Sequence, residues 1–282
     1  MADKSESPRK TGRRRGGAHR KRSERDQGRA IQQLPWRIPR HRDAPIEPLD
    51  AEGIHAIHNA AMRIVEEIGI DFLNEEAKSV LKAAGCRVVP GCDTVKLDRD
   101  FIMEKVRLAP AQFDMTPRNA NRAVTVGDGS MLFTNVSSPP NVMDLDRGRR
   151  PGTFDAYSDL IKISQYFNCI HLLSGYPVEP VDVHASVRHL DCTYAKLTLS
   201  DKVTHTYSLG AERVEDVMEM VRIAGGLSHD EFDAKPRMFT NINSSSPLKH
   251  DWPMLDGAMR LARRGQPTIV TPFTLAGAMA PV

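Results

Sequence analysis

The sequence lacks the long apolar run of a membrane-spanning helix, since no run in its 282 residues approaches about 20 consecutive apolar residues. The basic N-terminus is not followed by the apolar stretch of a signal peptide. Cysteine is scarce, and the four residues show no C-x-x-C spacing: Cys86, Cys92, Cys169 and Cys192. These absences argue against a membrane protein, a zinc site and a disulfide framework, and they predict reduced thiols in a cytoplasmic protein.

Aromatic and acidic residues are both rare at the N-terminus. Up to Arg42 the chain carries 14 Lys and Arg against 4 Asp and Glu, and no aromatic residue precedes Trp36. Because the whole chain has a net charge of only +3, the basic excess belongs to the tail. We predict that residues 1–44 form a disordered tail and a proline-stiffened linker. Clustered arginine suits nucleic-acid phosphates, but without interleaved aromatic residues a solubilising extension is favoured.

Residues 45–150 carry a mixed pattern that predicts an α+β region. Asp50 and Asp98 are placed to cap two helices, and Asn74 begins another helix between them. A strand or a hairpin is predicted at residues 88–97. Two further strands are predicted at residues 123–126 and 131–134, joined as a hairpin by an Asp-Gly turn.

A regular alternation of apolar runs and helical stretches begins after residue 150. The runs recur about every 30 to 35 residues, the length of one strand–loop–helix unit: residues 169–177, 202–209, 238–243 and 268–274. Equal units favour an α/β fold in which residues 151–282 form the first half of a (β/α)8 TIM barrel, and a doubly wound open sheet stays open as the alternative. The fourth unit stops at Val282 before its helix, so we expect the N-terminal fragment of a longer enzyme.

The ends of these runs carry polar and aromatic side chains and no Gly-rich phosphate motif, metal-ligand cluster or carboxylate pair. Catalytic groups of a barrel collect at the carboxyl ends of its strands. We therefore predict a substrate-binding set of Tyr176, Glu179, His205, Tyr207, Asn241, Asn243, Ser246 and Phe273. Structural roles stay open: the tyrosines pack, His205 belongs to the core, and the Asn-Ser run caps the next helix. No catalytic residue and no metal ligand is assigned.

Several blocks of sequence resemble the trimethylamine methyltransferase (MttB) family from about residue 45 to the end. The longest are Gly175-Tyr176-Pro177-Val178-Glu179-Pro180, Asn241-Ile242-Asn243-Ser244-Ser245-Ser246-Pro247-Leu248 and Thr271-Pro272-Phe273-Thr274-Leu275-Ala276-Gly277-Ala278-Met279-Ala280-Pro281-Val282. The resemblance implies a TIM barrel that moves a methyl group from a methylated amine to the Co(I) centre of a separate corrinoid protein.

The same resemblance implies that the chain binds no cofactor directly, because the corrinoid partner carries the cobalamin, and it leaves a homo-oligomer open. Family members with pyrrolysine act on trimethylamine, and members without it act on quaternary amines such as glycine betaine. The pyrrolysine position lies beyond Val282. An inactive half-barrel that serves only as an interaction module is the alternative.

Elementary chemistry favours a quaternary amine. Such a cation leaves as a neutral tertiary amine after losing its methyl group, so it needs orientation and desolvation more than a general acid. Each aromatic face contributes about 0.5 to 2 kcal/mol to holding it, and the aromatic residues of the predicted set suit that role. The two asparagines and Ser246 suit a substrate carboxylate. Free trimethylamine needs prior activation, and no activating group is evident.

Overall fold

The structure is a computed structural model that describes residues 31–245, 247–272 and 275–277. The chain divides after Pro35, and every helix and strand within the described ranges belongs to the unit that begins at Trp36. The predicted disordered tail before residue 31 lies outside the described residues. The described ranges contain no helix with the length and apolar character that a bilayer crossing requires.

The centre of this unit is a three-stranded parallel sheet in the order β11-β9-β8. The strands are β8 (Thr204–Tyr207), β9 (Met238–Asn243) and β11 (Thr268–Thr271). Thr206 lies beside Thr240, which in turn lies beside Thr268, so the carboxyl ends of the strands meet at one edge. Single parallel bridges join Val203 to Leu172 and Leu172 to Thr134. The predicted parallel alternation is therefore present, and the described residues contain no closed barrel.

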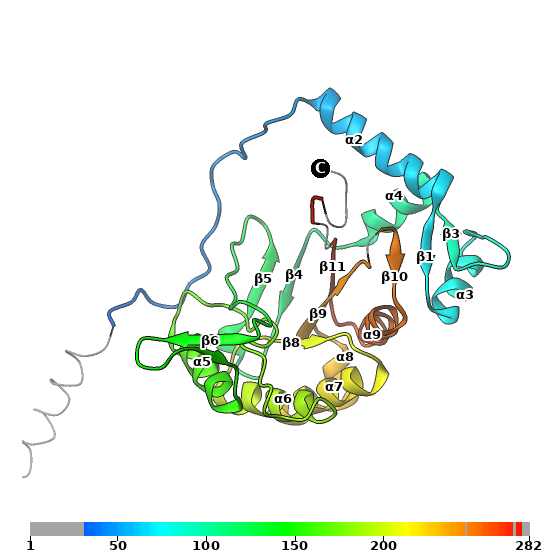
Figure 1. Cartoon of the computed structure of the whole chain (residues 1–282). Coiled ribbons are helices and arrows are strands. Elements are labelled where there is room, and N and C mark those ends of the chain that lie inside the picture. Colours follow the sequence, from blue (N-terminus) through cyan, green and yellow to red (C-terminus); the bar gives the residue numbers. More distant parts are fainter. Residues whose placement is uncertain (1–30, 246, 273–274, 278–282) are drawn as a thin grey trace, which may run out of the picture. The chain divides into compact units, whose positions relative to one another are not determined.

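Four helices line one side of this sheet in chain order (Figure 1). They are α5 (Phe154–Tyr166), α6 (Arg188–Leu199), α7 (Ala211–Gly225) and α9 (Trp252–Arg263), with the short α8 (His229–Asp233) between the last two. Local chemistry begins α9, since Asp251 accepts a hydrogen bond from the Met254 backbone N–H at 2.9 Å. Apolar residues of α7 and α9 then pack on Met238 of β9, for example Val214 and Leu261.

The opposite face of the sheet is covered at its amino end by an antiparallel pair. The pair is β4 (Gln112–Met115) with β5 (Val124–Gly127). Met115 and Val124 pack with Val203 and Phe239 of the sheet, and Trp36 joins this cluster from the extended N-terminal segment. The amino end of this face is therefore filled with apolar side chains.

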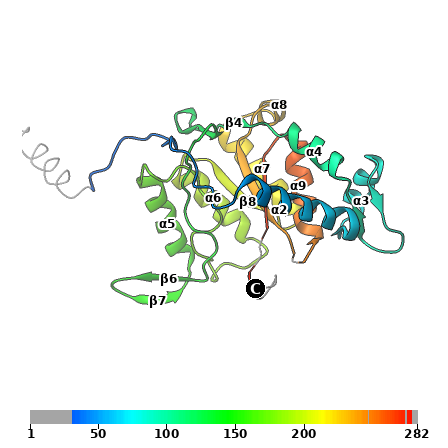
Figure 2. The ribbon, with the colours of Figure 1, turned by 90° about the horizontal axis from the view of Figure 1, so that it is seen from above.

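The remaining elements form a small sheet and a separate hairpin. The sheet has the order β10-β1-β3-β2, built from β1 (Ile70–Phe72), β2 (Arg87–Val88), β3 (Thr94–Lys96) and β10 (Lys249–His250). It is accompanied by α2 (Ala51–Arg63), the π-helical turn η1 (Ile64–Ile68), α3 (Glu75–Ala83) and α4 (Arg99–Leu108). The 3-10 turn η2 (Ala120–Arg122) lies beside the central sheet, where Arg122 pairs with Asp201. The hairpin β6 (Asn141–Asp144) and β7 (Gly148–Pro151) projects at the margin of the unit (Figures 1 and 2).

The predicted hairpin of residues 123–126 with 131–134 is wrong, although its turn forms. Asp128 and Gly129 have φ angles of 51° and 66°, as an Asp-Gly turn requires. The chain beyond the turn pairs elsewhere, because the Met131 N–H donates to the Pro39 carbonyl at 2.8 Å. The predicted partner strand is replaced by β4, which pairs with β5 along its whole length.

The run of residues 169–177 is not a regular strand, contrary to the sequence prediction. Only Leu172 makes β-bridges. The next backbone N–H groups are taken by side chains: Ser174 donates to Asn135 Oδ1 at 3.0 Å, and Gly175 donates to Ser137 Oγ at 3.0 Å. Tyr176 donates to Tyr207 Oη at 2.8 Å. Side-chain acceptors therefore replace the backbone hydrogen bonds of a β-strand where this segment reaches the predicted site.

Candidate functional site

Aromatic side chains gather where β8 ends beside the segment that holds Tyr176. The rings of Tyr176 and Tyr207 meet edge to face, with centroids 4.8 Å apart and planes at 72°. Tyr157 of α5 lies 5.7 Å from Tyr176, and the His205 imidazole lies 5.1 Å from Tyr207. The structure thus brings together three residues of the predicted set, Tyr176, His205 and Tyr207, and adds the buried Tyr157 behind them.

The close approach of Tyr207 depends on a glycine. A Cβ atom built on Gly175 would lie 1.9 Å from Tyr207 Oη, a separation that no real side chain tolerates. The freed space lets Tyr207 Oη accept the Tyr176 N–H and hydrogen bond Ser138 Oγ. Burial raises the pKa of Tyr207 and of Tyr176, so both phenols stay neutral at physiological pH.

A line of amide and imidazole groups runs across the same face from β8 to β9. His205 Nε2 lies 2.6 Å from Asn241 Oδ1, and Asn241 Nδ2 donates to Asn243 Oδ1 at 3.3 Å. This direction of bonding places the proton of His205 on Nε2, because an amide oxygen only accepts. Burial lowers the pKa of His205 to about 3, so the ring is neutral. Two further predicted residues, Asn241 and Asn243, are therefore linked to His205.

Lys196 of α6 also belongs to this site, and the sequence analysis missed it. Its side chain is 3% exposed. Its Nζ donates to the carbonyls of Ser174 at 2.9 Å and His205 at 3.1 Å, and it lies 5.7 Å from the centroid of the Tyr176 ring. Burial lowers the pKa of Lys196 to about 7. The available clue was its spacing, since Lys196 follows the buried Cys192 by one helical turn.

Glu179 lies at the rim, and its carboxylate is already engaged. It forms an ion pair with Arg188, whose Nε and Nη2 also donate to the Val183 carbonyl at 3.1 and 2.8 Å. Its role in substrate binding stays a prediction. Ser246 and Phe273 lie outside the described residues.

A cavity of about 20 Å³ opens beside these groups, enough for a single water molecule. Two imidazoles line it, and the buried Nδ1 atoms of His189 and His205 have no hydrogen-bond partner. The other ring nitrogen of His189 lies 2.8 Å from Asp216 Oδ2. A buried ring nitrogen without a hydrogen-bond partner costs free energy. These two nitrogens are therefore available to bond a water molecule or a ligand.

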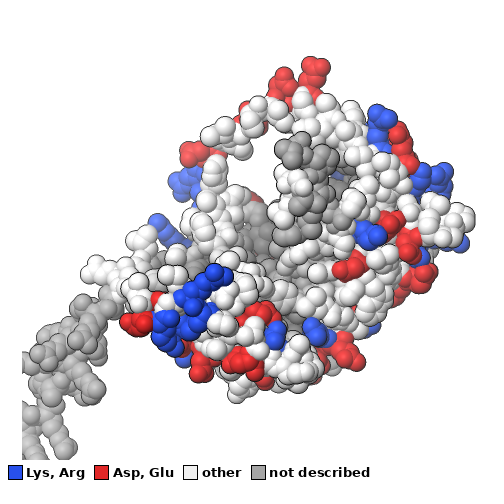
Figure 3. Space-filling view, viewed as in Figure 1, with Lys and Arg blue, Asp and Glu red and all other residues white. Residues whose placement is uncertain are grey.

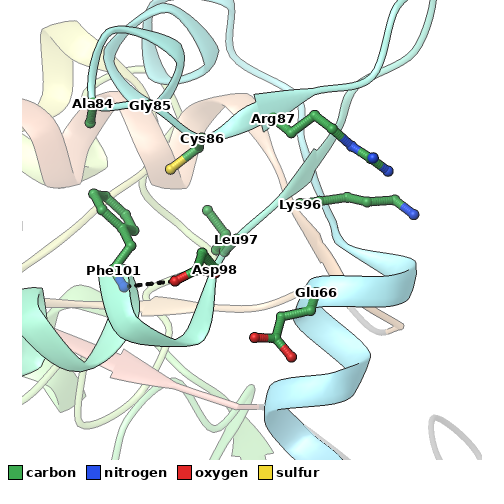
Figure 4. Close-up of a pocket in the computed structure, with 9 residues that line it drawn as sticks. All are labelled: Glu66, Ala84, Gly85, Cys86, Arg87, Lys96, Leu97, Asp98 and Phe101. Atoms are coloured by element: carbon green, nitrogen blue, oxygen red, sulfur yellow. Dashed lines mark hydrogen bonds between the residues drawn. The ribbon is translucent and has the colours of Figure 1, made fainter.

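A larger cavity of about 330 Å³ lies in the N-terminal region, among α3, α4 and the β2–β3 pair (Figure 4). Its acidic groups already have structural partners: Glu66 bonds Arg99 through the backbone N–H and the guanidinium, and Asp98 caps α4. Burial raises the pKa of the Cys86 thiol, which leaves it protonated and unreactive. Within the described ranges no three His, Cys, Asp or Glu side chains are placed to hold a metal ion.

Comparison with known sequences decides the family. The family model described as trimethylamine methyltransferase (MTTB) matches residues 13–282. The chain belongs to this family. The resemblance found in the sequence is confirmed, and the match begins well before residue 45, within the basic tail.

Named relatives of the MTTB family cover most of this chain. A glycine betaine methyltransferase of Desulfitobacterium hafniense is 34% identical over 233 residues, which is 83% of this chain and 48% of the relative. A trimethylamine methyltransferase MttB of the same species is 21% identical over 236 residues, 82% of this chain and 46% of the relative. A proline betaine:corrinoid methyltransferase of Eubacterium limosum is 23% identical over 235 residues, 81% and 48% of the two chains. The chain therefore spans about half the length of these relatives.

Proposed function

We propose that this protein moves a methyl group from a methylated amine to the Co(I) centre of a separate corrinoid protein. The proposed site is the carboxyl-end cluster of Tyr176, His205, Tyr207, Asn241 and Asn243, with Glu179, Ser246 and Phe273 as its remaining predicted members. The observation that carries the proposal is the edge-to-face pair of Tyr176 and Tyr207 above a neutral imidazole–amide line. Names of relatives that pair an amine with a corrinoid support it.

The residues of the site suit a reaction without proton transfer. Loss of a methyl group from a quaternary ammonium leaves the C–N electron pair on nitrogen, so the departing amine is neutral and needs no acid. Neutral phenols and a neutral His205 offer orientation and low polarity, which favour a step that disperses charge. The corrinoid supplies the methyl-accepting cobalt as a second substrate. The side chains of this protein hold the amine and exclude water.

A quaternary amine such as glycine betaine is the proposed substrate, with trimethylamine as the alternative. The rings of Tyr176 and Tyr207 offer aromatic faces to a cation, worth about 0.5 to 2 kcal/mol for each face. Asn241 and Asn243 offer amide groups for a carboxylate. The relative at 34% identity is named for glycine betaine, which supports the same choice.

The corrinoid partner is proposed to approach along hairpin β6–β7. Ser138 contacts Tyr207, and its N–H donates to the Tyr176 carbonyl. Since the chain enters β6 at Asn141, the base of the hairpin lies close to these two tyrosines. The hairpin exposes Met143 and Leu145, at 75% and 101%. Figure 3 shows Lys and Arg gathered over this region. Exposed apolar and arginine side chains are typical of a protein interface.

The parallel units are proposed to be half of a (β/α)8 barrel. The strand order, the unit length and the family support this arrangement. An inactive half-barrel that only binds partners is the second candidate. It is supported by β11, which pairs with β9 on one side and has no strand on its other side among the described residues. Ile269 and Val270 on that strand are 51% and 65% exposed, and an exposed apolar edge invites pairing.

The test is a methyl-transfer assay of the chain with a Co(I) corrinoid protein and a panel of methylated amines. The absorption spectrum of the cobalt centre reports the transfer. Glycine betaine should give transfer, and the free corrinoid with betaine alone is the control. Binding of betaine without transfer to any acceptor would favour the interaction module. Neither transfer nor binding with any amine would contradict the proposed function.

A further inference from the structure

A buried lysine beside a proposed cation site calls for a physical reason. Lys196 takes part in none of the ion pairs found among the described residues 31–245, 247–272 and 275–277, although it is 3% exposed. Its ammonium relies on two backbone carbonyls and the Tyr176 ring. Removing an ammonium from water without a countercharge is costly. The fold therefore holds an uncompensated positive charge where the substrate is to bind.

We propose that Lys196 is a specificity-determining residue that makes this site prefer zwitterionic betaines over methylated amines that carry only a positive charge. The inference rests on the proposed function, and it names the substrate class of the same site. A simple cation at the Tyr176 and Tyr207 rings is repelled by the Lys196 ammonium through a poorly solvated space, where charges act strongly. A betaine brings a carboxylate, which compensates both its own ammonium and that of Lys196.

The groups that face Lys196 leave it without another countercharge. On its own helix lies Cys192, whose pKa burial raises to about 12, so the thiol is neutral. The phenols from the neighbouring elements are neutral for the same reason: Tyr157, Tyr176 and Tyr207. His205 of β8 is neutral as well.

The charged groups nearby are occupied. Glu179 is paired with Arg188, and Asp216 accepts from His189. Arg213 of α7 lines the small cavity together with Lys196 and adds a second positive group. The electrostatic balance of the site is therefore positive, and a ligand carboxylate is the missing partner.

The preference should depend on pH in a definite direction. Desolvation holds the pKa of Lys196 near 7, so the ammonium is populated below that pH and lost above it. Binding of a simple cation should tighten as the pH rises, whereas the advantage of a betaine should shrink. Betaine binding near neutral pH should also draw a proton onto Lys196, because the carboxylate raises the pKa of its ammonium.

The experiment is titration calorimetry of the whole chain with tetramethylammonium and with glycine betaine, at about pH 6 and about pH 8, on either side of the pKa of Lys196. At the lower pH the protein should favour betaine by at least on the order of tenfold. Lys196→Met should tighten tetramethylammonium binding, weaken betaine binding and remove the pH dependence. The control is Lys162→Met, an exposed lysine paired with Asp159 on α5, which should change neither affinity.

The outcomes separate the inference from the proposed function. An unchanged preference for glycine betaine over tetramethylammonium in Lys196→Met would overturn the inference and leave the proposed function standing. If that variant does not fold, proton uptake on betaine binding to the wild-type protein, measured in buffers of different ionisation enthalpy, takes its place, and no uptake would overturn the inference. Failure of every variant to bind either ligand would overturn the proposed site, and the inference with it.

Discussion

Each end of the central sheet holds a buried lysine near an aromatic ring, and the two lysines have different surroundings. Lys202 at the amino end lies 5.5 Å from the Trp36 ring centroid, and Lys196 at the carboxyl end lies 5.7 Å from that of Tyr176. Lys202 donates to the carbonyls of Ser164 and Phe167.

A network of charged and polar groups fills the space beside Lys202 at the amino end. Asp201, next to Lys202, forms an ion pair with Arg122 and accepts hydrogen bonds from Asn119 and Gln165. The guanidinium of Arg122 lies 4.4 Å from the Trp36 ring centroid. Near Lys196 the structure instead leaves a small cavity and two ring nitrogens without partners. Polar groups without partners beside a buried lysine and a cavity are typical of a ligand site.

Removing Trp36 should have the largest effect on stability. Trp36→Ala leaves a hole in the cluster of Met115, Val124, Val203 and Phe239, so we expect a loss of about 3 kcal/mol in the free energy of unfolding. Betaine affinity of the folded protein should stay the same. Urea unfolding and calorimetry measure the two quantities. A large loss of affinity in folded protein would erase the distinction between the two ends.

Adding a methyl group at Gly175, at the carboxyl end of the sheet, should weaken both betaine binding and the fold. Gly175→Ala drives a methyl group against Tyr207 Oη, so we expect about 2 kcal/mol of destabilisation and a loss of betaine affinity on the order of tenfold. The matched control is Gly91→Ala, where an added Cβ meets nothing within 4 Å although φ is 77°. Normal affinity in Gly175→Ala would show that the Tyr207 position is not needed.

The two lysines should separate in a pH series. Folding lowers the pKa of Lys196 from 10.5 to about 7, and that of Lys202 from 10.5 to about 8. The unfolded chain then holds more protons than the folded chain, so the free energy of unfolding rises with pH, by up to about 1.4 kcal/mol per unit for one group. Between pH 7 and 8 the rise comes from Lys196, and Lys196→Met should flatten it. The free energy of unfolding is measured by urea unfolding at each pH. An equal slope against pH in the wild type and in Lys196→Met would contradict the burial of a neutral amine at position 196.

The smallest effect is expected at the hairpin. Arg149→Ala on the exposed part of β7 should slow methyl transfer to the corrinoid protein a few-fold at low salt and leave betaine affinity unchanged, because exposed charges act mainly on encounter. Raising the salt concentration should remove the difference between variant and wild type. The control is Lys162→Met, at an exposed position of α5. No change in the transfer rate at low salt would direct the search for the docking surface elsewhere.

Local sequence predicted the parts of the fold whose causes are local. The caps Asp50 and Asp98 begin their helices as the pattern indicates, and β9 runs from Met238 to Asn243 as predicted. The failures all involve distant partners. β1 pairs in parallel with β10 across most of the chain, and Met131 bonds Pro39 and forms no hairpin. No local propensity specifies which distant strand wins such a competition.

The site shows the same division. Its tyrosines, His205 and the two asparagines were predicted because they stand at the ends of periodic apolar runs, and the structure brings them together. Lys196 was missed because a lysine within a helix is normally solvated. Only its burial among neutral phenols distinguishes it.

The sequence by itself determined the family, the strand–helix alternation and the helix caps, because apolar spacing and capping chemistry act over a few residues. The tertiary structure decided which backbone donors near Tyr176 turn to side chains, and which of two buried lysines lies beside a cavity with unpartnered ring nitrogens. Those properties depend on groups far apart in the chain meeting in a poorly solvated space, where one missing partner changes the pKa of an amine and the ligand that the amine accepts.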